Sequence, residues 1–418
     1  MDSNNRQDLT SASSLVKKNI LSAEIISHSN EFDPTVLFVE KILIDAIKQG
    51  VSDIHFEPYE LDYRIRYRHD GLLSTIATPP LLQANRIASR IKIMANMDIS
   101  QRRLPQDGRF KLMSPLSVPI DCRVNSCPTI SGEKIVIRIL NSDSTQPTID
   151  LLGLLPSQKN FFLGALSRPQ GMIVVTGPTG SGKTFTLYAA LNQLNTGDKN
   201  ISTVEDPVEI KVNGINQINT NTKAGLTFST TLRALLRQDP DVLMIGEIRD
   251  LETAEIAIKA AHTGHLVLST LHTNSAAETL TRFLNMGIPA LNLASSIRLI
   301  IAQRLIRVLC NFCKLSRTDL VYAHLVELGI SSPDPKLLSS YKAMGCKQCK
   351  NGYHGRMAIF EMMPISKKLS EMIMSGMDSF KLLQQAQQEG MKTLYEAGLQ
   401  QVIAGISSLE EIHRVMVE

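Results

Sequence analysis

Residues 171–184 read GMIVVTGPTGSGKT, and this stretch decides the fold of the chain. A short apolar strand leads into a turn that matches the pattern G-x-x-x-x-G-K-[ST] at every fixed position. Glycines let backbone N–H groups turn around phosphates, Lys183 adds a positive charge, and Thr184 offers its hydroxyl to Mg²⁺. A chance glycine-rich turn rarely fills all of these positions between a strand and a helix. The stretch therefore predicts an ATP site made of Gly177, Pro178, Thr179, Gly180, Ser181, Gly182, Lys183 and Thr184.

Further apolar strands are expected around residues 201–204, 242–245 and 266–270, with helical patterns between them. Strands that alternate with helices indicate an α/β fold, in which helices cover both faces of a parallel sheet. Functional groups of such folds gather at the carboxyl ends of the strands. The residues that follow these strands are therefore the first candidates for catalysis.

Acidic residues follow two of the strands. Gly246 stands where an aspartate is usual, so Glu247 is the carboxylate that we expect near Mg²⁺. Glu205 ends the preceding strand, and we expect it to polarise the attacking water. Asp206 and Glu209 come next, and the alternative for both is a solvated or helix-capping carboxylate.

Two histidines, His265 and His272, bracket the strand at 266–270, and we expect both near the nucleotide edge of the sheet. A single histidine is more often an ordinary hydrogen-bonding residue than a catalyst, so that alternative stays open for each. His262 falls on the preceding helix, where the ordinary interpretation is preferred.

The six cysteines divide into two groups. Cys310-x-x-Cys313 and Cys346-x-x-Cys349 have the paired spacing of a four-cysteine zinc site. The spacer between the pairs is longer than in compact ribbons, so a chain without metal is the alternative. A closed site of four thiolates would be structural and not hydrolytic. Cys122 and Cys127 fit no such pattern and are expected to be ordinary thiols.

Composition limits the class of protein. With 418 residues, of which 43% are hydrophobic and 20% charged, the chain has material for several packed domains. A net charge of +4 argues against a dedicated nucleic-acid binder, and the absence of Trp leaves few stacking surfaces for single strands. The apolar runs at 261–277 and 283–297 contain too many polar residues for a membrane span, and the first residues do not resemble a secretory signal. We therefore expect a cytoplasmic protein with reduced thiols.

A smaller α/β domain is expected before the nucleotide domain. The apolar spacing from Pro34 predicts a helix, and residues 61–68 alternate as a strand that ends at the turn Asp70-Gly71. A second helix is predicted over 85–97 and a strand over 132–140. Arg103, Arg109 and Arg123 lie beside turn signals, where surface salt bridges are the ordinary interpretation. The domain boundaries that we expect are a mobile arm (1–33), the small domain (34–140), a linker (141–150), the ATPase domain (151–300), a zinc insert (301–365) and a helical C-terminal region (366–418).

Six blocks of this sequence resemble those of the secretion ATPases of the type IV pilus extension and type II secretion group (the PilB/GspE type), in the order of that family. They are VSDIHFEP (51–58), RLPQDGRF (103–110), GPTGSGKT (177–184), TVEDPVE (203–209), LRQDPDVLMIGEIRD (236–250) and TGHLVLSTLHTNSA (263–276). The resemblance runs from about residue 34 to the end. The segment INQINTNTKAGLTF (215–228) and the four-cysteine insert look nearer to the pilus extension motor.

The resemblance implies a RecA-like ATPase domain preceded by a PAS-like domain, and a homohexameric ring at the cytoplasmic face of the inner membrane. It also implies that Arg109 and Arg123 reach the nucleotide, that Glu205 is the acidic-box glutamate, and that Glu247 acts beside Mg²⁺. His265 and His272 match the histidine box. The implied partner is an inner-membrane platform protein that adds pilin-like subunits. Longer relatives carry another N-terminal domain that docks onto a membrane-associated partner, whereas about thirty residues precede the core here.

Two other classes of function stay open from the sequence. A DNA-uptake or conjugation motor would share the ATPase core, and a nucleotide-binding structural module would turn over little ATP. The intact Glu205 and Glu247 argue against the second of these classes. Direct DNA binding is a further idea, because Arg64, Arg66 and Arg68 repeat along one strand.

Overall fold

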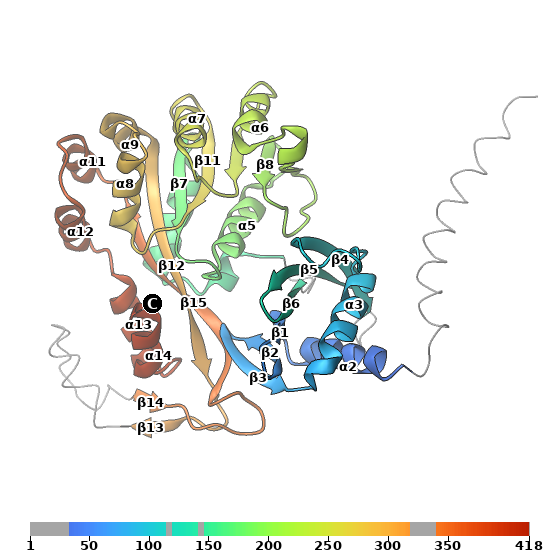
Figure 1. Ribbon diagram of the computed structural model, residues 1–418. Coiled ribbons are helices and arrows are strands. Elements are labelled where there is room, and N and C mark those ends of the chain that lie inside the picture. The colour runs from blue at the N-terminus through green and yellow to red at the C-terminus, as the bar shows by residue number, and fades with distance from the viewer. Residues whose placement is uncertain (1–32, 114–118, 141–145, 318–339, 418) are drawn as a thin grey trace, which may run out of the picture. The chain divides into compact units, whose positions relative to one another are not determined.

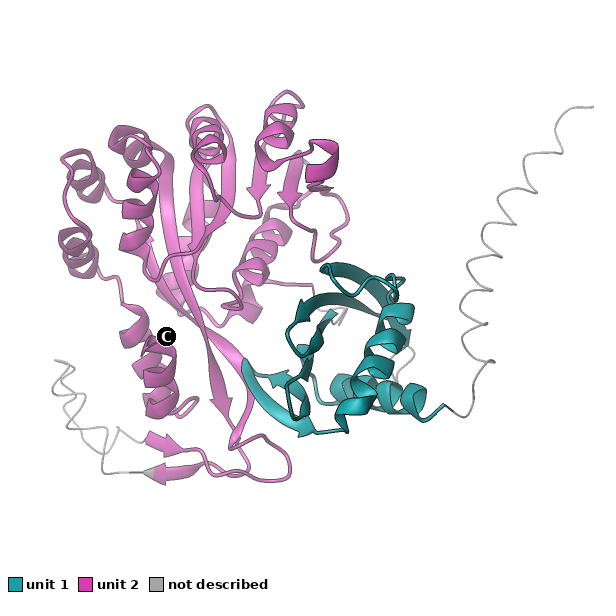
Figure 2. Ribbon diagram, in the orientation of Figure 1, with its two compact units in different colours: residues 1–143 teal, residues 144–418 magenta. Residues whose placement is uncertain are grey.

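The structure, a computed structural model, describes residues 33–113, 119–140, 146–317 and 340–417. The chain divides into two compact units, which are residues 1–143 and residues 144–418 (Figure 2). Each unit has its own sheet, and each is described by itself. Part of the expected N-terminal arm (1–33) and of the linker (141–150) lies outside the described residues.

The first unit is a six-stranded antiparallel sheet in the order β3-β2-β1-β6-β5-β4, with helices α2 and α3 (Figure 1). Its elements are α2 (Pro34–Lys48), β1 (Asp53–Pro58), β2 (Tyr63–His69), β3 (Leu72–Ala77), η2 (Leu81–Gln83), α3 (Ala84–Met94), β4 (Gln106–Met113), β5 (Pro119–Thr129) and β6 (Gly132–Leu140). Both predicted helices and the predicted hairpin are present. The hairpin turns where Asp70 and Gly71 both have positive φ, which matches the right-handed twist of the strands.

The second unit is a seven-stranded sheet in the order β15-β12-β7-β11-β10-β8-β9, and every pair but β12–β15 is parallel. Its elements up to the cysteine region are η3 (Ile149–Leu152), α4 (Pro156–Leu166), β7 (Gly171–Thr176), α5 (Lys183–Leu194), β8 (Ile201–Glu205), β9 (Asn216–Asn219), η4 (Thr222–Ala224), α6 (Phe228–Leu235), β10 (Val242–Ile245), α7 (Leu251–His262), β11 (Leu266–Leu271), α8 (Ala276–Asn285), α9 (Ala290–Ser296) and β12 (Ile297–Leu309). The predicted α/β fold with a mainly parallel sheet is confirmed.

Alternate residues of the central strand β7 pack into two different cores. Met172 and Val174 belong to the core formed with α6 to α9, whereas Ile173 and Val175 belong to the core formed with α4 and α5. All six residues of β7 are buried, as expected for a strand in the middle of a sheet covered on both faces. This burial fixes the end of β7, and with it the start of the nucleotide-binding turn.

The region after residue 300 differs from the predicted zinc insert over 301–365, because two strands of the main sheet lie within it. β12 continues to Leu309, and β15 (Tyr353–Pro364) pairs with β12 along most of its length. Between them the described chain contains the cysteines and the small pair β13 (Leu315–Arg317) and β14 (Ser340–Lys342). The cysteines therefore lie on an excursion, by which we mean the segment 310–352 that leaves the nucleotide-binding sheet between β12 and β15.

The C-terminal region is helical from Ser366, as predicted, and Ser366 itself caps the first helix. Its helices are α11 (Lys367–Met374), α12 (Ser379–Gln388), α13 (Leu394–Ile403) and α14 (Leu409–Val417). Apolar residues of all four helices join the core on the α6–α9 side of the sheet. Among the described residues, no helix combines the length and apolarity that a membrane crossing requires.

Candidate functional site

The turn after β7 forms a phosphate loop over residues 177–184 (Figure 1). Gly177, Gly180 and Gly182 have φ of 146°, 81° and 88°, a region that side chains rarely allow. A Cβ on Gly177 would also lie 2.5 Å from the carbonyl oxygen of Gln303 on β12. Glycine is therefore required here by both backbone conformation and packing. The loop leads directly into α5, whose first residue is Lys183.

Lys183 is buried and curls back over the loop. Its Nζ donates to the carbonyl oxygens of Gly177, at 2.7 Å, and Pro178, at 3.0 Å. Burial lowers the pKa of Lys183 to about 8, and the charge of Arg304 adds to this lowering, while Glu247 partly opposes it. A phosphate would supply the anion that this ammonium lacks among its hydrogen-bond acceptors.

Two further features of the loop, besides Lys183, fit a nucleotide phosphate. Ser181 Oγ is buried and has no hydrogen-bond partner among the described residues. The N-terminus of α5 also presents free N–H groups and the positive end of the helix dipole. Thr184 follows Lys183 in the first turn of α5, where its hydroxyl would serve Mg²⁺.

Glu205 is the last residue of β8 and is buried. Its carboxylate accepts hydrogen bonds from Tyr188 Oη and Thr203 Oγ1, both at 2.7 Å. Burial raises the pKa of Glu205 above its usual value, although these two donors and Gln217 oppose the rise. Glu205 is therefore held in one orientation and binds a proton more readily than an exposed glutamate, as suits a residue that receives a proton from water.

Glu247 follows β10, next to β8 in the sheet. Gly246 N donates to Val204 O at 2.8 Å, so the residues around Glu247 lie beside the end of β8. The Glu247 carboxylate is hydrogen-bonded by Arg249 and lies 3.3 Å from His272 Nε2. Burial alone would raise the pKa of Glu247, but these two partners hold it below its usual value. The carboxylate of Glu247 is therefore held in its ionised form, which a cation ligand requires.

Of the two histidines, His272 lies where expected and His265 does not. His272 follows β11 at the edge that carries the phosphate loop, and it is half-exposed. His265 precedes β11, its carbonyl accepts from the first residue of β7, and its Nδ1 lies 3.0 Å from Ala260 O. The predicted position of His265 at the nucleotide edge is wrong, because residues that bracket a strand lie at its opposite ends.

The remaining acids near Glu205 are peripheral. Asp206 and Glu209 are both exposed, which agrees with the alternative of solvated carboxylates. His262 closes the last turn of α7, at the same edge as His265. None of the three is buried against the phosphate loop.

In the first unit, Arg109 and Arg123 lie opposite each other on β4 and β5. Arg109 is exposed, as is Arg103 in the preceding turn. Their role at a nucleotide stays a prediction from the family resemblance.

The arginine stripe on β2 (Arg64, Arg66 and Arg68) contacts side chains of the same unit. Arg66 makes a two-pronged bond to Glu57 at 2.7 and 2.9 Å, and Arg64 stacks on the ring of Tyr59. Arg68 lies 3.8 Å from a carboxylate oxygen of Asp53. Glu57 also pairs with Lys134 at 3.0 Å and Asp53 with Arg138 at 2.9 Å, so two carboxylates serve four cations and these contacts do not neutralise the stripe. Direct DNA binding stays an alternative from the sequence.

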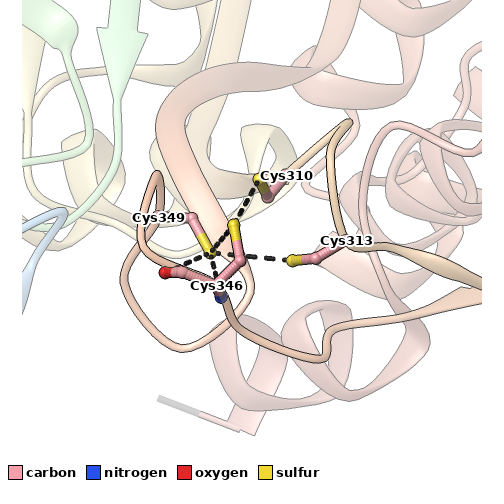
Figure 3. Close-up of side chains that lie close together, drawn as sticks. All are labelled: Cys310, Cys313, Cys346 and Cys349. Atoms are coloured by element: carbon pink, nitrogen blue, oxygen red, sulfur yellow. Dashed lines mark hydrogen bonds between the residues drawn. The ribbon is translucent and has the colours of Figure 1, made fainter.

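The four cysteines of the two C-x-x-C pairs converge (Figure 3). Their Sγ atoms all lie within 4.8 Å of one another, with separations of 3.9 Å for Cys310–Cys346, 3.7 Å for Cys313–Cys349 and 3.6 Å for Cys346–Cys349. A tetrahedral zinc ion with bonds of about 2.3 Å requires sulfurs about 3.8 Å apart. The cluster therefore has the size of a zinc site.

Backbone N–H groups also point at these sulfurs, as is usual around metal-bound thiolates. Gly345 N lies 3.3 Å from Cys313 Sγ, and Cys346 N lies 3.2 Å from Cys349 Sγ. Cys122 is buried and Cys127 exposed, and neither belongs to the cluster.

Some residues of the site were not found from the sequence. Tyr188 holds Glu205, Arg249 holds Glu247, and Gln303 and Arg304 lie beside the phosphate loop. The signal for the last two was the polar pair within the apolar run IIAQRLI (300–306). Tyr188 carries no comparable signal, because a single tyrosine on an apolar helix is an ordinary core residue.

Comparison with known proteins agrees with this geometry. A family model described as "Type II/IV secretion system protein" matches residues 28–414. The type IV pilus assembly ATPase PilB of Pseudomonas aeruginosa is 56% identical over 91% of this chain and 67% of its own length. The type II secretion system ATPase E of Vibrio cholerae is 41% identical over 94% of this chain and 78% of its own. The crystal structure of the pilus retraction motor PilT with bound ADP is similar, with a TM-score of 0.61 and 26% identity over 92% of this chain and 97% of that one.

Proposed function

We propose that this chain, which belongs to the family of Type II/IV secretion system proteins and is an ATP hydrolase, powers the extension of a type IV pilus. The higher identity to the pilus assembly ATPase, 56% against 41% for the type II secretion ATPase, favours a pilus over a pseudopilus. In this proposal six copies form a ring at the cytoplasmic face of the inner membrane. The ring acts on a membrane platform protein that adds pilin-like subunits.

One observation supports the chemical part of the proposal. The phosphate loop follows β7, Glu205 ends β8 and Glu247 follows β10, so three parallel strands bring these groups to one edge of the sheet. Lys183 and the N–H groups of the loop bind the phosphates, and Thr184 and Glu247 hold Mg²⁺. When bound, Mg²⁺ neutralises charge that develops on the phosphate oxygens.

Glu205 is the proposed acceptor of the proton from the attacking water. Tyr188 and Thr203 orient its carboxylate, and its raised pKa makes it a stronger base than an exposed glutamate. His272 orients Glu247, because its ring lies against that carboxylate. Arg109 and Arg123 are proposed to reach the transferred phosphate group from the first unit.

The four cysteines are proposed to hold a structural zinc ion. The cluster lies on the excursion between β12 and β15, and the proposed metal would serve as a brace for that excursion without contact to the nucleotide.

Steady-state hydrolysis by the purified full chain tests the enzymatic part. We expect Mg²⁺-dependent release of phosphate from ATP, and a loss of about 10²-fold or more in kcat for Glu247→Gln. Glu255→Gln is the matched control, because Glu255 is an exposed glutamate on α7. Turnover of Glu247→Gln equal to that of the wild type would refute the role of Glu247.

The choice of machinery has a separate test. Neighbouring genes for prepilins and a platform protein are expected, whereas genes for a relaxase or coupling protein would indicate a conjugation motor instead.

A further inference from the structure

A buried arginine on β12 lies beside the phosphate loop. Arg304 is 7% exposed, and its neighbour Gln303 contributes the carbonyl oxygen that abuts Gly177. Arg304 Nη1 donates to that same carbonyl at 3.2 Å. The guanidinium group therefore lies over the base of the phosphate loop.

The other end of the guanidinium group reaches the segment that follows β11. Arg304 Nη2 donates to Asn274 O at 3.3 Å and to Asn274 Oδ1 at 3.0 Å. The N–H of Asn274 donates to Glu278 Oε2 at 3.0 Å. Asn274 is thus held from both sides, between a cation on β12 and a carboxylate on α8.

The charge of Arg304 is not paired directly. Within the described residues, its hydrogen-bond acceptors are carbonyl oxygens, and no carboxylate oxygen lies within 4.0 Å of its nitrogens. Burial lowers the pKa of Arg304, and the charges of Glu361 and Glu278 only partly oppose this effect. A buried cation without an adjacent anion is costly, so packing alone does not account for Arg304.

The clamped segment carries a residue of the site. Asn274 is two residues from His272, whose ring lies 3.3 Å from Glu247 Oε2. Thr273, between them, is also fixed, because its N–H donates to Thr176 Oγ1 at 2.9 Å. The phosphate loop, the His272 segment and β12 are therefore joined at a single place.

We propose that Arg304 is a positioning residue of the ATPase reaction, which holds Asn274 so that His272 stays against Glu247. This proposal rests on the proposed function of Glu247. A neutral side chain at position 304 would leave Asn274 held from the Glu278 side alone, and we expect His272 to lie against Glu247 less of the time. Substitution of a residue that holds a metal ligand in place typically lowers activity 10- to 100-fold.

Two substitutions test the proposal by different routes. Arg304→Gln removes the charge and the fork. Asn274→Ala removes the side-chain acceptor Oδ1 from an exposed residue, keeps the backbone acceptor Asn274 O, and leaves the buried arginine in place. For Arg304→Gln we expect kcat to fall 10- to 100-fold, and for Asn274→Ala we expect a smaller fall, because one of the two hydrogen bonds remains; KM for MgATP should stay within about threefold in both. The double variant should be no slower than the slower single variant, because both substitutions break the same connection.

Arg304→Lys separates charge from geometry. Lysine keeps the charge but lacks the planar fork that reaches both Gln303 and Asn274, so we expect kcat between those of Arg304→Gln and the wild type. Arg298→Gln is the matched control, because Arg298 begins the same strand at the opposite edge of the sheet, where its Nε lies 3.5 Å from Gln170 O. Its kcat should equal that of the wild type.

Three results would overturn the proposal. They are an unchanged kcat in Arg304→Gln, independent effects that multiply in the double variant, or an increase in KM with kcat unchanged. Circular dichroism of each variant identifies those that fail to fold, and Asn274→Ala then remains informative. A different result tests the proposed function. Full turnover by Glu247→Gln would refute it, whatever the Arg304 variants do.

Discussion

At the scale of single residues, the site depends on hydrogen bonds that set the charge of two carboxylates in opposite directions. Donors around Glu247 overcome the effect of burial and lower its pKa, whereas those around Glu205 do not and its pKa stays raised. A cation ligand must be ionised, and a base must be able to take a proton. The two glutamates therefore have surroundings that match their proposed roles.

Tyr188→Phe is predicted to shift the acid limb of the kcat–pH profile to higher pH. The substitution removes the hydroxyl that donates to Glu205 at 2.7 Å, so the ionised carboxylate is less stable and the pKa of Glu205 rises further. A base is active above its pKa, and activity is lost as pH falls through that value. Initial rates measured across the acid range check the shift.

Tyr395→Phe is the matched control, because that hydroxyl contacts His413 and does not touch the site. If Tyr188→Phe lowers kcat at all pH values without moving the acid limb, Glu205 is not the group that titrates.

The sequence predicts residues well where a local pattern defines them. The phosphate loop, Glu205 and Glu247 follow from short motifs at strand ends, and their neighbours in the sheet place them at one edge. His265 fails because a motif does not say on which end of a strand its members lie. Tyr188 and Arg304 escape prediction because their importance comes from contacts with residues distant in the sequence.

At the scale of elements, β12 and β15 join the nucleotide sheet to the cysteine cluster. Neither strand was predicted, because β12 alternates poorly and its antiparallel partner follows some fifty residues later. Sequence patterns identify a strand by its local periodicity and not by its distant partner. The sequence therefore predicts the cysteine pairs, which form a local motif, but not the two strands on either side of them.

Cys346→Ser is predicted to lose zinc, which we expect at one ion per chain in the wild type. Three remaining thiolates no longer close a tetrahedral site. Elemental analysis of the purified chain measures the content. Cys127→Ser should keep full zinc, because Cys127 lies outside the cluster. A wild-type chain without zinc would contradict the assignment.

Helix α14 is fixed to β12 by one buried carboxylate. Glu411 accepts from Arg307 Nε at 2.9 Å and Nη2 at 2.6 Å, and from Arg414 Nε at 2.9 Å. Burial would raise the pKa of Glu411, but the bonds from Arg414 and Arg307 hold it below its usual value. Its contribution is therefore present above the pKa of the unfolded chain and is lost as pH falls through the folded value.

Glu411→Gln is predicted to lower the free energy of unfolding of the second unit by about 3 kcal/mol at neutral pH, because it leaves the half-buried Arg307 and Arg414 without their buried anion. Urea titration followed by circular dichroism measures the change. The difference from the wild type should shrink in acid. Glu410→Gln, at the exposed neighbouring residue, should cost little, and an equal loss in both variants would refute the role of the buried pair.

At the scale of the whole molecule, the chain is two compact units with separate sheets. The chain length predicted two to four domains, and the polar stretch 141–150 was the expected linker between the small domain and the ATPase domain. The arginines expected at the nucleotide lie in one unit and the phosphate loop in the other. Catalysis through Arg109 and Arg123 therefore requires the two units, of one copy or of neighbours, to meet.

Arg109→Ala is predicted to lower kcat by about 10³-fold, with Arg123→Ala similar, because an arginine brought to the transferred phosphate stabilises its charge. The rate is measured on the full chain, and native mass spectrometry tests whether it forms the proposed ring of six copies. Arg86→Ala is the control, as Arg86 is an exposed arginine of the same unit. Full turnover by both variants would exclude these arginines from the reaction.

The pairing of β12 with both β7 and β15 has a consequence for synthesis on the ribosome. The phosphate loop is complete in sequence once residue 184 is made, but Gln303, which packs against two of its glycines, is made more than a hundred residues later. At about 5–20 residues per second, the loop waits several seconds for that support. Until then ATP cannot stabilise the nascent chain by binding to its folded site. Early folding of the second unit must therefore proceed without help from its own ligand.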